Sequence, residues 1–310
     1  MKESIDLAII GAGIAGVSAS VYAKRAGLEF ALFEPKVVGG QLLLMESVDN
    51  YTGVSLGTKA RDLASELSDT LKKLEIEVIP EEISKFEVSG KQVKLHTQEG
   101  VTSANAAIIA TGASFRRLGI AREGELTGLG VSYCAICDGF FFKNKTVAVV
   151  GGGNTAVEEA IYLSNICSKV YLIHRRKDLR AIEYLQKELF HKGNVEVIFD
   201  TVVESLNGKE NLTGINIKNV LTGKTNTLAS NGLFVAIGVI PNTCIFKDAV
   251  ELDESGFIAT DEEMKTNCNF VWAAGDCRKR PLRQLITAAS EGAISAVGAY
   301  KYLKGGYISA

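Results

Sequence analysis

The sequence predicts an α/β protein built from two three-layer (ββα) units of Rossmann-like type, with the second unit inserted into the first. Two observations carry this prediction. An apolar strand, a glycine-rich loop, a helix and a second strand follow one another between residues 5 and 34, and the same order returns between residues 146 and 173. The apolar segment 269–274, which would return the chain to the first sheet, lies after the whole second repeat. A chain of 310 residues is long enough for two domains.

The first repeat has the spacing of a dinucleotide-binding site. A strand over 5–10 leads into Gly-Ala-Gly-Ile-Ala-Gly at 11–16, a helix is expected to about Ala26, and a strand over 28–33 ends at Glu34. Glycines in such a loop let the backbone approach a pyrophosphate at the helix N-terminus, and the acid accepts hydrogen bonds from ribose hydroxyls. A tight turn that binds nothing is the alternative.

The second repeat has a strand over 146–150, a glycine loop at 151–156, a helix over about 157–166 and a strand over 169–173. It differs from the first at the position of the acid. Glu34 stands 23 residues after Gly11, and His174 stands the same distance after Gly151. The basic residues expected around this position are His174, Arg175, Arg176 and Arg180. Cations here favour a ribose 2′-phosphate, so we expect a site for NADPH. A solvated basic surface is the alternative.

Two apolar segments, 106–109 and 233–238, are expected to be the last strands of the two nucleotide-binding sheets. The crossings between the units are expected after Thr111 and before Pro241. The predicted outer domain therefore comprises 1–112 and 243–310, and the predicted inserted domain comprises 113–242. Near the end of the chain, a strand over 269–274 runs into Gly275 and Asp276, and a helix is expected over 284–303. Asp276 can hold a ribityl hydroxyl and the helix N-terminus can favour an anionic reduced flavin, although a plain strand–helix pair is equally compatible.

The segment Cys134-Ala-Ile-Cys137-Asp138-Gly139 lies 14 residues before the second glycine loop. Two thiols at this spacing close and open a small disulfide, and a neighbouring nucleotide site suggests that electrons pass between a dinucleotide and this disulfide. Asp138 is a candidate general acid, provided that burial raises its pKa above about 3.9. The alternative for Asp138 is a turn residue. Zinc would need two more ligands, and no second closely spaced cysteine pair or histidine pair supplies them.

Composition excludes some other classes of function. The net charge of -2 leaves no basic footprint for nucleic acid, and no apolar run approaches the roughly 20 residues that span a bilayer. No export signal is expected ahead of the first strand. Three consecutive phenylalanines at 140–142 cannot share one face of a strand, so at least one is expected to be exposed, with an all-core placement as the alternative. The four remaining cysteines, at 167, 244, 268 and 277, are expected to be ordinary buried residues.

The sequence resembles the low-molecular-weight, bacterial-type thioredoxin reductases of the two-dinucleotide-domain flavoprotein superfamily. The motifs that carry the resemblance run from end to end: 11–16, 39–42, 50–51, 110–112, 134–139, 151–154, 174–176, 275–276 and 283–284. The CxxC-Asp-Gly segment just before the second glycine loop is the most diagnostic of them. Thr52 and Ile14 stand where the family commonly has proline.

The resemblance implies FAD in the discontinuous domain and NADPH in the inserted one. The implied FAD residues are Gly11, Ala12, Gly13, Ala15, Gly16, Glu34, Gly40, Gln41, Leu42, Asn50, Ala110, Thr111, Gly112, Gly275, Asp276, Arg283 and Gln284. The implied NADPH residues are Gly151, Gly153, Asn154, Thr155, Ala156, His174, Arg175, Arg176, Arg180, Ile237 and Gly238. It further implies a cytoplasmic homodimer, with Phe140 and Phe141 gripping thioredoxin.

The leading interpretation is an NADPH-dependent thioredoxin-disulfide reductase. Electrons are expected to pass from NADPH to FAD, then to the Cys134–Cys137 disulfide and on to thioredoxin, with the inserted domain rotating between half-reactions. Two alternatives within enzymes are a ferredoxin-dependent flavin reductase and one that serves a glutaredoxin-like or peroxidase partner. A flavin-binding redox sensor without turnover is the alternative from another class.

Overall fold

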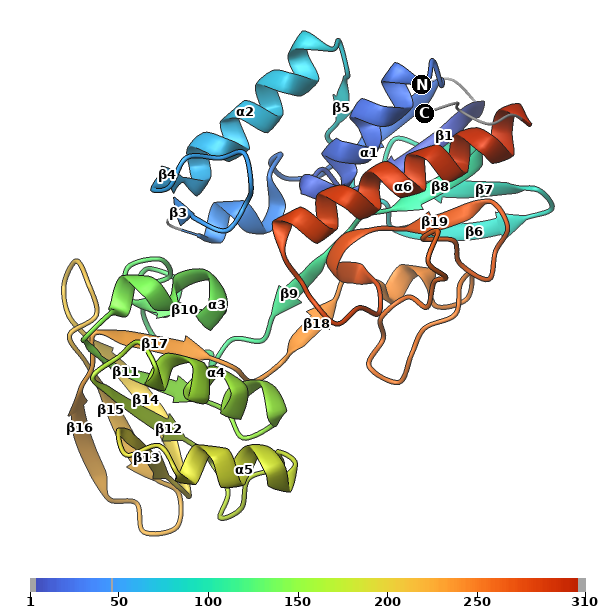
Figure 1. Cartoon of the computed structure of the whole chain (residues 1–310). Helices are drawn as coiled ribbons and strands as arrows, with labels where there is room; N and C mark the ends of the chain where they lie inside the picture. The colour runs from blue at the N-terminus through green and yellow to red at the C-terminus, as the bar shows by residue number, and fades with distance from the viewer. Residues whose placement is uncertain (1–3, 46, 306–310) are drawn as a thin grey trace. The chain divides into compact units, whose positions relative to one another are not determined.

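The computed structural model describes residues 4–45 and 47–305, which divide into two units (Figure 1). The first unit holds 4–43, 51–114 and 240–305, and the second holds 115–239 together with the described part of 44–50. The ends of the inserted segment, at 115 and 239, lie within three residues of 113 and 242, where the sequence places them. The assignment of 44–50 to the second unit has no counterpart in the sequence prediction.

The first unit is built on a seven-stranded sheet in the order β5–β2–β1–β8–β7–β6, with β19 beside β8. Its strands are β1 (Ser4–Ile10), β2 (Phe30–Phe33), β5 (Val78–Ile79), β6 (Lys85–Ser89), β7 (Gln92–His96), β8 (Val101–Ile109) and β19 (Val271–Ala273). The first half of β8 pairs antiparallel with β7, and its second half pairs parallel with β19, with Val271 opposite Ala107. The chain therefore returns to the first sheet after the second unit, as the sequence predicts.

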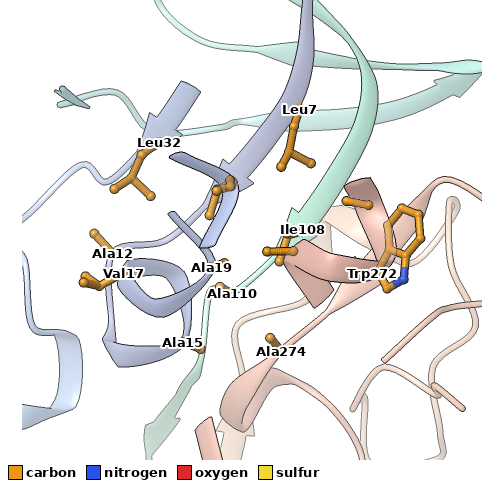
Figure 2. Packing of buried hydrophobic residues seen from close by; sticks show 14 of the residues in the cluster. Leu7, Ala12, Ala15, Val17, Ala19, Leu32, Ile108, Ala110, Trp272 and Ala274 are labelled. Carbon is orange, nitrogen blue, oxygen red and sulfur yellow. The ribbon is translucent and has the colours of Figure 1, made fainter. Parts of the chain in front are cut away.

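Alternation along β1 creates two cores, one on each face of the sheet. Leu7 and Ile9 join Ile108 and Trp272 in the cluster beneath the helices (Figure 2). Ala8 and Ile10 belong to the other cluster, on the opposite face. The helical segments of this unit are α1 (Ile14–Arg25), η1 (Gly40–Leu44), α2 (Ala60–Lys73), η3 (Cys244–Phe246), η4 (Gly275–Cys277) and α6 (Leu285–Lys304).

Helices α1 and α6 lie side by side over one face of this sheet (Figure 1). Small residues permit the approach: a Cβ added to Gly292 would lie 2.1 Å from the carbonyl oxygen of Ala15, and the Ser18 hydroxyl donates to the Ala289 carbonyl at 2.7 Å. This contact fixes the start of α1, and with it the first glycine loop, against the C-terminal helix.

The second unit repeats the plan around a five-stranded parallel sheet in the order β10–β17–β11–β12–β13. These strands are β10 (Val131–Ser132), β11 (Thr146–Val150), β12 (Lys169–Ile173), β13 (Val195–Ile198) and β17 (Gly232–Val235). Helices α4 (Asn154–Ser164) and α5 (Glu183–Phe190) cover one face, through a cluster that includes Val147 and Val149. An antiparallel sheet covers the other face, and it consists of β14 (Thr201–Asn207), β15 (Gly214–Asn219) and β16 (Thr225–Ala229). The predicted three-layer arrangement is confirmed.

Short elements complete the chain. The two crossings form a small sheet of β9 (Ala113–Phe115) and β18 (Val239–Pro241), and β3 (Ser47–Val48) pairs with β4 (Thr58–Lys59). Helix α4 begins three residues before the predicted start, because its first turn is the end of the glycine loop. The phenylalanines at 140–142 lie in a 3-10 helix, η2 (Gly139–Phe142), and not in a strand. Within 4–45 and 47–305, none of the helices combines the length and the apolar character that a membrane crossing requires.

Candidate functional site

The first glycine loop joins β1 to α1 and closes against the end of β8. Gly11 has φ of +103°, and a Cβ there would lie 2.4 Å from the Ala110 carbonyl oxygen. Gly16 is equally constrained, since its Cβ would meet the Gly11 carbonyl oxygen at 1.8 Å. Gly13 precedes the helix with open space around it. The loop therefore packs tightly on the protein side and leaves an open backbone at the helix N-terminus, where a pyrophosphate would rest.

Glu34, at the end of β2, is tied to this loop. Its Oε2 accepts a hydrogen bond from the Ala12 N–H at 2.9 Å, and its Oε1 accepts from the Lys36 N–H at 2.9 Å. The carboxylate thus stands beside the loop at the position predicted for a ribose-binding acid. The other predicted residues of this region vary in exposure: Ala15, Leu42 and Ala110 are buried, Gly112 is half-buried, Gly40 and Asn50 are exposed, and Thr111 donates to the Asn242 carbonyl at 2.7 Å.

A second polar group of the first unit gathers where β19 ends. Gln41 Nε2 donates to the Ala113 carbonyl at 2.8 Å and to Asp276 Oδ2 at 3.3 Å. Burial raises the pKa of Asp276 against the opposing charges of Arg280 and Arg283. Asp276 Oδ1 is 3.6 Å from Arg280 Nη1 in an ion pair but accepts no hydrogen bond, and Arg283 Nε is buried without a hydrogen-bond partner. Both atoms therefore have hydrogen-bonding capacity left for a ligand. The guanidinium of Arg283 lies over the ring of Phe257, 4.1 Å from its centroid.

The start of α6 is capped by its own side chains. Gln284 and Thr287 form a reciprocal capping box, which occupies part of the helix N-terminus expected to face the flavin. One turn further on, the buried Glu291 accepts from the Gly275 N–H at 2.8 Å and forms ion pairs with Arg278 at 2.7 Å and Arg280 at 3.1 Å. Sequence reasoning missed this cluster. The signal was a single acid inside the small, apolar helix 285–299, preceded by three arginines.

The second glycine loop reproduces the geometry of the first. Gly151 has φ of +156°, and its Cβ would lie 2.4 Å from the Ala236 carbonyl oxygen, as the Cβ of Gly11 would from Ala110. Gly153 precedes α4 with open space around it. Asn154 Oδ1 accepts from the Ile182 N–H at 2.9 Å, Thr155 is exposed and Ala156 is buried. Past β17, Ile237 is half-buried and Gly238, with φ of +113°, is exposed.

The basic residues after β12 separate into two environments. Arg175, Arg176 and Arg180 are exposed and line one hollow, together with Lys177, which the sequence prediction did not include. His174 instead lies buried beneath the loop: a Cβ on Gly152 would meet its Cε1 at 2.2 Å, and its Nε2 is 3.1 Å from the Asp178 carbonyl oxygen. Burial lowers the pKa of His174. The structure therefore gives His174 a place under the glycine loop, which differs from the expected place on the phosphate-binding surface.

The dithiol lies beside α4, the helix that the second glycine loop opens. Cys134 and Cys137 form a disulfide, with Cα atoms 5.3 Å apart, across α3 (Ala135–Asp138). Ala135, between them, is fully buried in the cluster that contains Ala156 and Ala160 of α4. The fold thus packs the short helix of the disulfide against the helix that begins at the second glycine loop.

Two carboxyl groups stand beside this disulfide. Asp138 Oδ2 accepts a hydrogen bond from the Ser132 hydroxyl at 2.5 Å, and the Cys134 N–H donates to the same hydroxyl at 3.1 Å. Glu159 Oε1, on α4, accepts from the Ala135 N–H at 3.4 Å. Burial, and then the charges of Asp138 and Glu158, raise the pKa of Glu159 to about 7. The sequence did not predict a role for Glu159, because the sequence pattern places it at an ordinary polar position of an amphipathic helix.

Apolar side chains next to the disulfide are exposed. Phe140 is 67% exposed and Ile136 is 55% exposed, whereas Phe142 packs edge-on against Phe234. This supports the expectation that at least one phenylalanine of 140–142 faces solvent. The expectation for the remaining cysteines was wrong in part, since Cys167 and Cys277 are buried but Cys244 is exposed and Cys268 is half-buried.

Residues 5–292 match the model of the family described as pyridine nucleotide-disulphide oxidoreductase. This chain belongs to that family. A thioredoxin reductase of Coxiella burnetii is 42% identical to it and covers 96% of both chains. The solved thioredoxin reductase of Streptococcus pyogenes is 39% identical over 99% of this chain and all of its own, with a TM-score of 0.94. Within the pyridine nucleotide-disulphide oxidoreductases the chain accordingly groups with the thioredoxin reductases.

This family member is also similar to a ferredoxin-flavin thioredoxin reductase of Clostridium acetobutylicum. That solved structure is 31% identical, covers 98% of this chain and 99% of its own, and has a TM-score of 0.54. Membership of the pyridine nucleotide-disulphide oxidoreductases implies that the chain binds a flavin and a pyridine nucleotide, and the disulfide supplies the second redox centre of the family name.

Proposed function

We propose that the protein is an NADPH-dependent flavoprotein that reduces the disulfide of thioredoxin. The observation that carries the proposal is the Cys134–Cys137 disulfide, which lies at a short helix packed against the one that the second glycine loop opens and is flanked by Asp138. The similarity to thioredoxin reductases over nearly the whole chain supports the choice of partner.

The first unit fits FAD. Its glycine loop leaves an open helix N-terminus for a pyrophosphate, Glu34 beside that loop would bind the ribose, and Asp276 and Arg283 keep buried polar atoms without hydrogen-bond partners. Gln41, hydrogen-bonded to Asp276, would orient that carboxyl. Bound FAD would supply the electron pair that opens the disulfide. The assignment of 1–112 and 243–310 to FAD binding rests on this fit.

The second unit, 113–242, fits NADPH. Its glycine loop has the same open helix N-terminus, and the hollow after β12 offers Arg175, Arg176 and Arg180 to a 2′-phosphate. His174 would act from beneath, by holding the Gly152 backbone in place with its neutral ring. The basic hollow argues for NADPH as donor, and against NADH, which lacks the 2′-phosphate.

The reduced dithiol would transfer electrons to the disulfide of the partner protein. Two electrons and one proton convert the disulfide to one thiol and one thiolate, and the thiolate attacks the partner's disulfide to form a mixed disulfide. The partner's departing sulfur needs a proton, and the Asp138 carboxyl is placed to give it. The second cysteine then gives its proton to the ionised Asp138 and attacks the mixed disulfide. The Cys134–Cys137 disulfide re-forms, and the partner's second sulfur leaves and takes that proton, so the partner is released as a dithiol. Phe140 and Ile136, exposed beside the disulfide, would contact the partner.

Three further parts of the proposal concern the whole protein. The second unit would rotate on the β9–β18 crossings, since the nicotinamide and the dithiol are both carried by it and would take turns at one flavin. The enzyme would act as a homodimer, and it would work in the cytoplasm. These parts follow from the family resemblance and from the topology of one unit inserted into another.

Coupled turnover tests the proposal. NADPH oxidation is followed with oxidised thioredoxin as acceptor, with NADH in parallel and Cys137→Ser as the inactive control. Activity with NADPH, little activity with NADH and none in Cys137→Ser are expected. Flavin reduction by NADPH without reduction of thioredoxin would refute the partner. If NADPH leaves the flavin oxidised and reduced ferredoxin reduces it, the electron donor would instead be ferredoxin, which the name of the Clostridium acetobutylicum relative includes.

A further inference from the structure

The carboxyl of Glu159 is the feature of the dithiol site that the proposed chemistry does not use. It reaches from α4 to the backbone amide of Ala135, the residue directly after Cys134. Its Oε1 accepts that N–H at 3.4 Å, and its Oε2 is buried without a hydrogen-bond partner. A buried carboxylate held by one long hydrogen bond is poorly stabilised, so the neutral acid is favoured at this place.

The charges around Glu159 have the same sign. Asp138 faces it from α3, and Glu158 adjoins it on α4; both disfavour its ionisation, and burial acts more strongly in the same direction. Only the hydrogen bond from the Ala135 N–H favours the carboxylate, and an amide N–H carries no positive charge to balance it. The carboxyl therefore changes its charge near neutral pH, within one residue of a cysteine that must itself become an anion.

We propose that Glu159 controls how readily the reduced dithiol forms a thiolate: its neutral acid permits the thiolate, and its carboxylate opposes it. Glu159 touches the backbone beside Cys134 and not a sulfur atom, so it is a positioning residue. The consequence is that the thiolate fraction changes less with pH than it would for an isolated thiol. As pH rises and thiols would ordinarily ionise, Glu159 gains a negative charge beside them and holds the thiolate fraction down.

This inference rests on the proposed redox role of the dithiol, but its test does not need turnover. In the FAD-loaded Cys137→Ser protein, Cys134 is a single free thiol at this site. Its alkylation by iodoacetamide is followed between pH 6 and pH 9.5, and the product at residue 134 is measured by mass spectrometry, because the exposed Cys244 also reacts. The same profile is recorded after adding Glu159→Gln, and after adding Glu158→Gln as the matched control. Glu158 is exposed, lies one residue away and loses the same charge.

The expected result is a difference confined to the alkaline side. At pH 6 Glu159 is mostly neutral, so Glu159→Gln should alkylate within about twofold of its parent. At pH 7.5 the parent mostly carries the Glu159 carboxylate, while a thiol with a pKa of about 8.5 is still mostly protonated. Glu159→Gln should therefore react roughly two- to fivefold faster at this pH, equivalent to a thiol pKa lower by about half to one unit. Glu158→Gln should change the rate much less, because its charge lies in solvent.

Superimposable profiles for Glu159→Gln and its parent would overturn the proposal, as would equal gains in both glutamine variants. If Glu159→Gln fails to fold, the parent protein alone decides the matter. Its alkylation curve should be broader than a single titration between pH 7 and pH 9, and a single simple titration would count against the proposal. Thioredoxin reduction can fail in a separate assay without altering any of these outcomes.

Discussion

At the scale of single residues, the site depends on how Asp138 is held. The Ser132 hydroxyl bridges Asp138 Oδ2 and the Cys134 N–H, so the carboxyl, the hydroxyl and the first cysteine form one hydrogen-bonded unit. A group fixed in this way can deliver a proton along one direction, which is what a departing thiolate requires. The short helix α3 carries both cysteines and Asp138 and keeps the three in one orientation.

Replacing that acid tests its role. Asp138→Asn keeps the shape and the hydrogen bond with Ser132 but removes the transferable proton, so the rate of thioredoxin reduction should fall about a hundredfold. Binding of both cofactors should not change. Steady-state kinetics of NADPH oxidation give the rate, with Asp62→Asn, an exposed residue of α2, as the control. A variant that retains more than half of the normal rate would remove Asp138 from the mechanism.

The basic hollow predicts a change of donor preference. In Arg176→Ala one charge-assisted contact with the 2′-phosphate is lost, which is worth about 1.5–3 kcal/mol, so KM for NADPH should rise roughly ten- to a hundredfold. KM for NADH should stay the same, because NADH has no 2′-phosphate. Lys218→Ala, an exposed cation on β15 paired with Glu204, controls for net charge. Equal effects on the two nucleotides would place the phosphate elsewhere.

Glu159 also predicts a pH dependence of folding stability. Its pKa in the folded chain, about 7, lies above the usual pKa of a glutamate side chain, 4.5. Such a group stabilises the folded state below the unfolded pKa, and that stability is lost as the pH rises through the folded pKa. Between pH 4.5 and 7.5, Glu159→Gln should therefore lose less stability than the parent, by an amount on the order of 2 kcal/mol. Urea unfolding at several pH values measures it, and parallel pH dependences would contradict the buried, neutral state of Glu159.

The sequence predicted the positions of some site residues but not their burial. The register of the second repeat pointed to the basic residues after β12, because the distance from Gly151 to His174 matches that from Gly11 to Glu34. Three of these residues line one hollow in the structure. The sequence could not distinguish His174 from its neighbours, since burial under Gly152 depends on how the chain returns from β12. Glu159 and Glu291 were missed for the same reason: only the packing of two elements turns a polar helix position into a buried charge.

At the scale of elements, the packing of α1 against α6 determines where the first glycine loop lies. Strand and helix order were predictable from apolar periodicity, and β1, β11 and β12 have the predicted bounds at their carboxyl ends. The helix starts were less predictable, because α4 begins inside its glycine loop at Asn154. The close approach of α1 and α6 was not predictable, because a glycine in a helix does not indicate which other element packs against it.

Gly292 tests this contact. Alanine has the higher helix propensity by about 1 kcal/mol, so a solvent-exposed glycine would gain stability from Gly→Ala. At Gly292 the new Cβ would lie 2.1 Å from the Ala15 carbonyl oxygen, and forced separation of the helices should cost about 1–3 kcal/mol. Gly292→Ala is therefore expected to lower the unfolding midpoint and weaken FAD retention. Ser290→Ala, on the exposed side of α6, is the control. A more stable Gly292→Ala protein would show that the helices can separate freely.

At the scale of the whole molecule, one unit interrupts the other, and the β9 and β18 crossings lead the chain into and out of the inserted segment 115–239. The proposed function asks the second unit to present first its nucleotide site and then its dithiol to one flavin. A short covalent cross-link between the two units should therefore stop turnover while both cofactors stay bound, and cleaving the link should restore it. A longer, flexible link should have less effect. Full activity with the short link would show that rotation is not needed.

The central claim is that electrons from NADPH reach the Cys134–Cys137 disulfide through the flavin. The most direct measurement mixes the FAD-loaded protein with NADPH without oxygen, alkylates the thiols at once and determines by mass spectrometry whether residues 134 and 137 carry the label. We expect a bleached flavin and labels on both cysteines with NADPH, and neither with the same concentration of NADH. A flavin that bleaches while the 134–137 disulfide stays intact would contradict it.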